Sequence, residues 1–207
     1  MEAIKTGILL VISGPAGSGK GTVIKELHEL GDYKYSISAT TRKARKGETE
    51  GQSYYFVSEQ DFNDKVKKGE MLEYVNHLGN YYGTPKSPVE QMLKEGHNVI
   101  LEIEVIGAQN IKKNFPEAVL VFLVPPNRTE LEARLRGRGT EPEDVILERL
   151  KKAEEEIKSI GKYDYLVINE SGRQKEAALE IDFIAKAARH RLNPQKAESF
   201  FEEYLRI

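Results

Sequence analysis

A glycine-rich stretch near the beginning of the sequence has the residue types and spacing of a phosphate-binding loop. Its residues are Gly14-Pro15-Ala16-Gly17-Ser18-Gly19-Lys20-Gly21-Thr22. The stretch follows an apolar run, residues 8–12, that predicts a buried strand, and it precedes residues 23–27, whose apolar spacing is helical. Glycine lets backbone N–H groups turn toward one point, and the positive end of the helix dipole adds to them. The stretch therefore predicts a polyphosphate site, with Lys20 reaching the outer phosphates.

The hydroxyl that such loops use to contact magnesium is displaced by one position. In the pattern G-x-x-x-x-G-K-[ST] the hydroxyl follows the lysine directly, but here Gly21 follows Lys20 and the hydroxyl comes at Thr22. We therefore predict Thr22 as a metal contact and leave the mode of contact open. The alternative is a glycine turn that only packs a strand on a helix.

A basic segment follows the first predicted helix. Four of the five residues at 42–46 are positively charged, hydroxyl residues come directly before them, and no acidic residue lies between Asp32 and Glu48. Guanidinium groups bind phosphate oxygens bidentately, so the segment could clamp a second phosphate. A solvated basic loop is the alternative, and the residue types alone leave both open.

Two carboxylates end the apolar run of residues 98–104. Glu102 and Glu104 are one residue apart, so the alternation of a strand puts them on the same face. The carboxyl end of a strand in an α/β sheet faces the ligand crevice, where an acid can hold Mg²⁺ directly or through water. A polar strand end at the surface is the alternative.

Three arginines lie on or beside a predicted mobile segment over about residues 134–152. Arg138 lies between Gly137 and Gly139, and Arg134 comes shortly before this glycine pair. Arg149 follows on the next predicted helix. Arginines on such a segment can close over phosphates during phosphoryl transfer. The Lys/Glu residues after Arg149 indicate an exposed helix face.

The composition excludes several classes of function. The chain has 207 residues, a net charge of −2, no cysteine and four histidines without metal-ligand spacing. A balanced charge gives no global field that attracts nucleic acid or membranes, and the lack of cysteine excludes disulfides and thiolate chemistry. We predict no nucleic-acid or membrane partner and a cytoplasmic location.

The elements that must position these residues alternate between strands and helices. Core strands are predicted at residues 8–12, 35–40, 98–104, 119–124 and 165–169, with helices between them and a final helix at 174–192. Five such units predict an α/β fold with a doubly wound parallel sheet and insertions between the first and third units.

The insertion is predicted to hold a small sheet and two helices. A strand at residues 54–57 precedes a helix that opens at Ser58 and stops at Gly69. Residues 71–75 and 81–84 flank a turn signal, so we expect a hairpin in which Glu73 and Tyr82 face one another. A further helix is predicted with Pro88 at its first position.

Taken together and in order, these motifs resemble guanylate kinase, of the nucleoside monophosphate kinase family of P-loop proteins. The resemblance covers about residues 7–188 and rests on residues 14–22, 38–45, 54, 73, 81–84, 102–107, 137–141 and 169. It implies a three-layer P-loop fold in residues 1–188, with an inserted mixed α/β GMP-binding subdomain at about 36–88 and a helical lid at about 134–152. Residues 189–207 form a tail of unknown role.

The resemblance also implies an activity and a set of site residues. The activity is transfer of the γ-phosphoryl group of ATP to GMP and dGMP in purine nucleotide metabolism, with Mg²⁺ as cofactor. By resemblance, GMP would be held by Ser38, Arg42, Arg45, Tyr54, Glu73, Tyr82, Thr84 and Glu104. ATP would be held by residues 14–22 with Arg134, Arg138 and Asn169. The catalytic residues would be Lys20, Arg42, Arg138 and Arg149, and the metal residues Thr22 and Glu102.

Two other functions stay open beside this one. A kinase of another nucleotide, such as AMP, shares the loop, and a non-catalytic guanylate-kinase-like binding module shares the fold. Such modules have typically lost the phosphate loop, whereas Gly14, Gly19 and Lys20 are present here. Ile106 departs from the family pattern, in which glutamine is common. The oligomeric state is predicted as monomer or homodimer.

Overall fold

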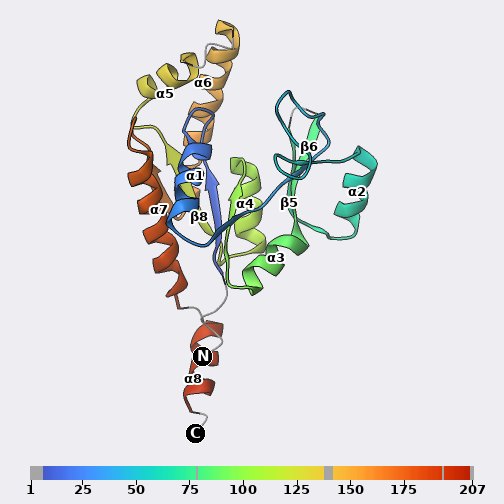
Figure 1. Cartoon of the computed structure of the whole chain (residues 1–207), viewed down its shortest axis with the longest axis vertical. Coiled ribbons are helices and arrows are strands. Elements are labelled where there is room, and N and C mark those ends of the chain that lie inside the picture. Colours follow the sequence, from blue (N-terminus) through green and yellow to red (C-terminus); the bar gives the residue numbers. More distant parts are fainter. Residues whose placement is uncertain (1–6, 78, 138–141, 193, 206–207) are drawn as a thin grey trace.

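A five-stranded parallel sheet forms the core of the protein in the computed structural model, which describes residues 7–77, 79–137, 142–192 and 194–205. The strand order is β2–β7–β1–β8–β9, and every neighbouring pair is parallel. Figure 1 shows the whole chain, with β8 of this sheet labelled. The strands are β1 (Leu9–Ser13), β2 (Tyr33–Tyr35), β7 (Asn98–Glu102), β8 (Val119–Val124) and β9 (Tyr165–Ile168). The predicted doubly wound α/β class is confirmed.

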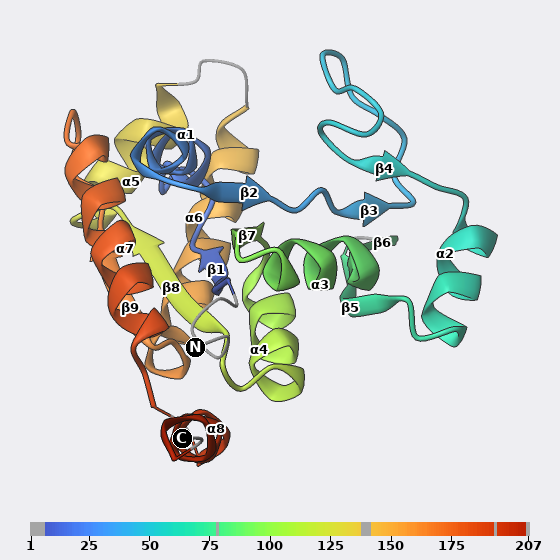
Figure 2. The same ribbon diagram turned by 60° about the horizontal axis from the view of Figure 1, so that its bottom comes forward.

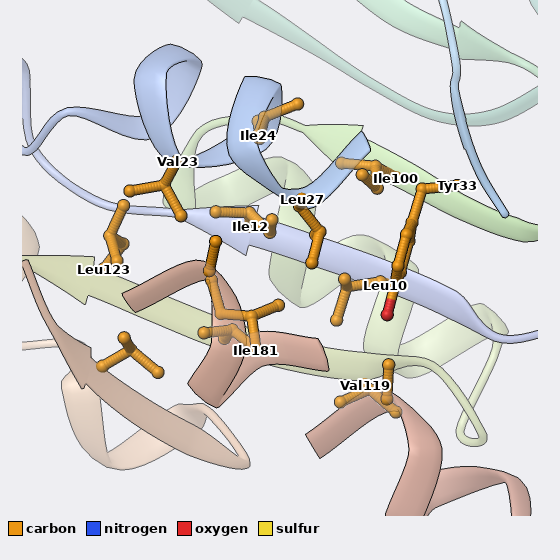
Figure 3. Packing of buried hydrophobic residues seen from close by; sticks show 14 of the residues in the cluster. Leu10, Ile12, Val23, Ile24, Leu27, Tyr33, Ile100, Val119, Leu123 and Ile181 are labelled. Carbon is orange, nitrogen blue, oxygen red and sulfur yellow. The ribbon is translucent and has the colours of Figure 1, made fainter. Parts of the chain in front are cut away.

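Helices cover both faces of this sheet because β1 alternates between them. Leu10 and Ile12 pack with α1 (Lys20–Leu30) and α7 (Gln174–Arg189), as Figure 3 shows for α1 and for Ile181 of α7. Leu9 and Val11 pack on the other face with α3 (Lys86–Lys94) and α4 (Val105–Asn114). The period of two in β1 thus builds the three predicted layers.

A buried polar contact also ties α7 to the edge of the sheet. The Tyr33 hydroxyl on β2 donates to Asp182 Oδ1 at 2.8 Å, and Lys186 Nζ donates to Asp182 Oδ2 at 2.6 Å. Tyr33 and Asp182 are each 4% exposed. A buried carboxylate needs such partners, so α7 is held in place by polar as well as apolar contacts.

The insertion forms a second, four-stranded sheet beside the core (Figure 2). Its order is β4 (Tyr55–Phe56), β3 (Ala39–Thr40), β6 (Asn80–Pro85) and β5 (Met71–His77). Helix α2 (Glu59–Lys67) covers it through Phe62, which is fully buried and stacks on the ring of Tyr81 at 5.4 Å. The chain enters this sheet from β2 and leaves it from β6 into α3.

Three further α-helices and a short 3-10 helix, Ile160–Lys162, complete the described chain. Helices α5 (Arg128–Arg136) and α6 (Glu143–Ile157) bury Leu131, Leu135, Ile146 and Leu150 against one another and against Ala16 of the glycine loop. Helix α8 (Pro194–Tyr204) extends away from the body (Figure 1). Within the described ranges, no helix has the length and apolar content needed to cross a bilayer.

Four details of the sequence prediction are wrong. The strand expected at residues 35–40 is split between two sheets, because Ser36 N–H donates to Ile100 and Tyr55 N–H donates to Ser38. Helix α3 begins at Lys86, which puts Pro88 at its third position, where a missing N–H is still tolerated. Glu73 pairs with Thr84 rather than with Tyr82, which pairs with Val75.

The fourth concerns the acidic strand end. Strand β7 ends at Glu102, and Glu104 is already the N-cap residue of α4. The alternation of a strand therefore does not place Glu104.

Candidate active site

The glycine loop between β1 and α1 is closely packed by its neighbours. Gly14, Gly17 and Gly19 have φ angles of 154°, 90° and 87°, which other residues rarely adopt. A Cβ on Gly14 would lie 2.0 Å from the Leu123 carbonyl oxygen, and one on Gly19 would lie 2.4 Å from Asn169 Nδ2. The glycines are thus required both by backbone conformation and by space.

The start of α1 fits an anion. Its N-cap residue is Gly19, no side chain makes a capping hydrogen bond, and no acidic residue lies in its first turn. The N–H groups at the beginning of a helix have no intrahelical acceptor and carry the positive end of the dipole. The hydroxyl of Ser18 is fully buried beside them and has no hydrogen-bond partner within the described part of the chain. These are properties of a phosphate site.

Three of the predicted ATP-site side chains bind carbonyl groups in and beside this loop. Lys20 Nζ donates to the carbonyls of Gly14 at 2.7 Å and Pro15 at 3.2 Å. Asn169 Nδ2 donates to the Ser18 carbonyl at 2.8 Å, and Arg134 donates to the carbonyls of Asn169 at 2.7 Å and Ser18 at 3.4 Å. Arg134 and Asn169 therefore brace the loop, a role that the sequence does not signal.

Predicted phosphate-binding residues of the second site lie around Arg42. Its guanidinium stacks over the Tyr54 ring at 5.4 Å, and Nε donates to the Tyr82 hydroxyl at 3.1 Å. Both terminal nitrogens donate to Glu48 at 2.9 Å, and the backbone N–H of Arg45 donates to the same carboxylate at 2.7 Å. These hydrogen bonds lower the pKa of Glu48 to about 2, and those from the Arg42 side chain have the largest effect. Sequence analysis missed Glu48.

The predicted GMP residue Glu73 is buried where β5 of the second sheet packs against α4. It is 5% exposed, and its Oε1 accepts from the Thr84 hydroxyl at 2.8 Å. A Cβ on Gly107 of α4 would lie 2.8 Å from its Oε2, so the glycine makes room for the carboxylate. Burial raises the pKa of Glu73 to about 7, although hydrogen bonds from the Thr84 side chain and backbone act in the opposite direction.

One cavity of about 510 Å³ brings the predicted residues together. Its walls include all of the predicted GMP residues except Thr84, which lies behind Glu73, and also Glu102, Arg149 and Ala16 of the glycine loop. His77 and Lys152 also line it, and both contact Glu104, at 3.6 Å and 3.1 Å. The sequence did not single out either residue. Arg138 lies outside the described residues.

The residues predicted for Mg²⁺ suit a site completed by substrate. Glu102 lies in the cavity wall, where its Oε2 accepts from the Tyr35 hydroxyl at 3.4 Å, and Thr22 is exposed on α1. No group of three or more acidic or histidine side chains that could hold a metal occurs in the described ranges. Mg²⁺ commonly takes one or two protein oxygens and completes its shell with phosphates and water, so these two hard oxygen donors fit.

A glycine loop at the end of the central strand of a doubly wound sheet is the arrangement of P-loop proteins, and a cavity lined with arginines lies next to it. The guanylate kinase family model matches residues 6–182. The chain is 45% identical over 190 residues to a guanylate kinase of Clostridium tetani, covering 92% of this chain and 90% of that protein. It is 46% identical over 204 residues to one of Clostridioides difficile, covering 97% and 98%.

A solved structure has the same architecture. The crystal structure of guanylate kinase from Anaplasma phagocytophilum is 34% identical and superposes with a TM-score of 0.72, covering 90% of this chain and 88% of that one. The chain therefore belongs to the guanylate kinase family.

Proposed function

We propose that this enzyme carries out guanylate kinase activity with ATP on the glycine loop and GMP in the 510 Å³ cavity. The activity follows from family membership over nearly the whole chain. One observation carries the assignment of the two substrates. The buried Glu73 carboxylate and the Arg42 guanidinium line the same cavity, and Ala16 of the glycine loop lines it too.

In this proposal Glu73 reads the base. Guanine presents N1–H and N2–H₂ side by side, and an ionised carboxylate accepts from both. Adenine has an acceptor at N1, so it would leave the buried carboxylate without its partners. Sites built to hydrogen-bond a substrate can reject an analogue without those groups by about 10⁴-fold or more. Ser38, also in the cavity wall, would donate to guanine O6.

Phosphoryl transfer then needs alignment and charge neutralisation rather than a general base. The phosphate of GMP has a second pKa of about 6 and is already largely dianionic near neutral pH. Lys20, Arg134, Arg138 and Arg149 would offset the repulsion between the two anions and stabilise the charge on the transferred group. Glu102 and Thr22 would hold Mg²⁺ together with substrate oxygens, and the bound ion would supply positive charge next to the ATP phosphates. Closure of the predicted lid, at about residues 134–152, over the two substrates would keep water from the phosphoryl group.

The proposal also covers a second substrate, the cellular location and the oligomeric state. We include dGMP as a substrate, because the base contacts of Glu73 do not involve the ribose. A cytoplasmic location and a monomeric or homodimeric state stay predictions of the sequence analysis.

A substrate comparison tests the proposal. Wild type should use GMP, then dGMP, with AMP and UMP far behind. Glu73→Gln keeps the shape but turns one acceptor into a donor, so kcat/KM for GMP should fall about 100-fold or more, the scale of one or two charge-assisted hydrogen bonds. Glu70→Gln is the matched control, because Glu70 is exposed and comes directly before β5, the strand that carries Glu73. Wild-type AMP turnover that rivals GMP, or unchanged GMP kinetics in Glu73→Gln, would contradict the assignment.

A further inference from the structure

The guanidinium of Arg42 is almost fully engaged by the protein itself. It has five N–H groups. Nε donates to the Tyr82 hydroxyl at 3.1 Å, Nη1 donates to the Lys43 carbonyl at 2.7 Å and to Glu48 at 2.9 Å, and Nη2 donates to Glu48 at 2.9 Å. Among the described residues, these partners account for four of the five. A bidentate grip on a phosphate, which the sequence predicted for this segment, would need two.

Glu48 is part of the fold of this loop rather than a loose surface acid. Its Oε2 also accepts from the backbone N–H of Arg45 at 2.7 Å, and its own N–H donates to the Arg45 carbonyl at 3.0 Å. Its side chain is 21% exposed. Two backbone bonds within one turn and two charge-assisted bonds to Arg42 hold the carboxylate in a single place.

The hydrogen bond from Arg42 also determines the role of the neighbouring Tyr82 hydroxyl. The Tyr82 oxygen accepts from Arg42 Nε, so its own proton is available to another acceptor. The Tyr54 ring lies against the guanidinium at 5.4 Å and limits its rotation. In the cavity that both residues line, one N–H of Arg42 Nη2 and the hydroxyl proton of Tyr82 thus have no partner among the described residues.

We propose that Glu48 is a positioning residue for the substrate phosphate: it locks Arg42 so that a phosphate meets one Arg42 N–H and the Tyr82 hydroxyl instead of a bidentate guanidinium. The proposal rests on the assignment of this cavity to GMP. Because Glu48 neutralises Arg42, the remaining arginine charge in the cavity comes from Arg45, whose backbone the same carboxylate fixes, and from Arg149.

A competing mechanism would give the opposite sign. If Glu48 were an occupant that the phosphate must displace from Arg42, removing its charge would strengthen substrate binding. The bond to the Arg45 backbone argues against displacement, because a carboxylate that left Arg42 would also have to leave that N–H.

Glu48→Gln separates the two mechanisms by steady-state kinetics. Glutamine keeps one acceptor but turns its NH₂ toward an Arg42 N–H, so the lock fails. We expect KM for GMP to rise about tenfold or more and KM for ATP to change less than about twofold. The matched control is Glu50→Gln in the same loop, whose carboxylate accepts from the Phe56 backbone at 2.9 Å and has no arginine partner in the described chain. Its KM for GMP should stay within about twofold of wild type.

A double-mutant cycle then tests whether Glu48 acts through Arg42. Arg42→Met alone should raise KM for GMP, and adding Glu48→Gln to it should raise KM little further. Glu48→Asp keeps the charge, so its KM for GMP should lie between those of wild type and Glu48→Gln. If circular dichroism shows that the glutamine variant folds poorly, the aspartate variant replaces it in the test.

Each other outcome has a definite meaning. An unchanged or lowered KM for GMP in Glu48→Gln, additive effects in the cycle, or an aspartate variant no better than glutamine would overturn the role of Glu48. An unchanged KM in Arg42→Met would instead overturn the placement of the GMP phosphate in this cavity.

Discussion

The two halves of the proposed site position their ligand-binding groups in opposite ways. At the glycine loop the binding surface is backbone N–H, and side chains such as Asn169 and Arg134 hold the carbonyl side of the same backbone. In the four-stranded sheet the binding surface is side chains, and each is held by another side chain. Glu48 holds Arg42, and Thr84 holds Glu73.

This difference explains which half provides specificity. Backbone N–H groups at a helix start bind any phosphate, which every nucleotide carries. A buried carboxylate with a fixed partner accepts only donors in the right place, and a wrong base leaves it desolvated. Under the proposed assignment, the loop would supply affinity for a common group, whereas the small sheet would select the acceptor. The following predictions test this division.

The largest effect is expected from Lys20→Met. It removes a positive charge next to the transferred group and leaves the glycines in place, so kcat should fall by about 10³-fold with the fold retained. Turnover and circular dichroism check this together. Lys25→Met, on an exposed position of the same helix, is the control. A folded Lys20→Met enzyme with near-normal turnover would remove Lys20 from the catalytic set.

Gly19→Ala should affect mainly the ATP half. It combines a φ of 87° with a contact of 2.4 Å to Asn169 Nδ2, so the loop must shift. We expect kcat/KM for ATP to fall about 100-fold, which corresponds to about 3 kcal/mol, with a smaller change in KM for GMP. Gly69→Ala has a φ of 70° with open space around it and controls for backbone strain. An equal rise in both KM values would contradict the division.

Gly107→Ala is the counterpart in the GMP half. Its Cβ would lie 2.8 Å from Glu73 Oε2 and push the carboxylate from its position. KM for GMP should rise about tenfold, while KM for ATP should stay near wild type. Gly161→Ala, which meets nothing within 4 Å, is the control. A change in KM for ATP instead would show that Gly107 does not act through Glu73.

The smallest effect is a pH dependence of GMP binding. Glu73, with its pKa raised to about 7 by burial, is largely protonated at about pH 6.5, and the donors of guanine favour its ionised form. Binding therefore releases a proton from this carboxyl, and GMP affinity should rise about fourfold between about pH 6.5 and about pH 8. Calorimetry in buffers of different ionisation enthalpy measures the release. Glu73→Gln keeps only the titration of the GMP phosphate, so equal proton release in both proteins would contradict this origin.

The same raised pKa predicts the stability of the protein without substrate. A carboxyl whose pKa is higher in the folded than in the unfolded state makes folding less favourable as pH rises from the unfolded value, 4.5, to about 7. Above this window the cost is on the order of 3 kcal/mol relative to low pH. Denaturant unfolding of wild type against Glu73→Gln across this range measures it. A wild-type curve parallel to that of the variant would contradict the buried carboxyl as its source.

The core and the loop were predictable because their signals are local. The alternation in β1 and the glycine spacing of residues 14–22 each lie within one short segment. For the proposed second site, residue types alone indicated only the basic segment and the acidic strand end, with alternatives open. The individual residues were named through the resemblance to a family, because their contacts join distant segments. A one-residue difference in register decides whether Glu73 faces Thr84 or Tyr82. Glu48 lies in a loop, where no periodicity marks a partner six residues away.

The position of α7 has a consequence for how the polypeptide is made. The Tyr33–Asp182 contact joins residues 149 apart in sequence, and α7 supplies part of the cover over Leu10 and Ile12 of the central strand. Contacts this distant form late, because a long loop must close before they contribute. During synthesis from the N-terminus, the central strand therefore keeps one apolar face partly uncovered until α7 has left the ribosome. Folding of the nascent chain finishes only then, and before that point the exposed face is a surface for chaperones or for aggregation.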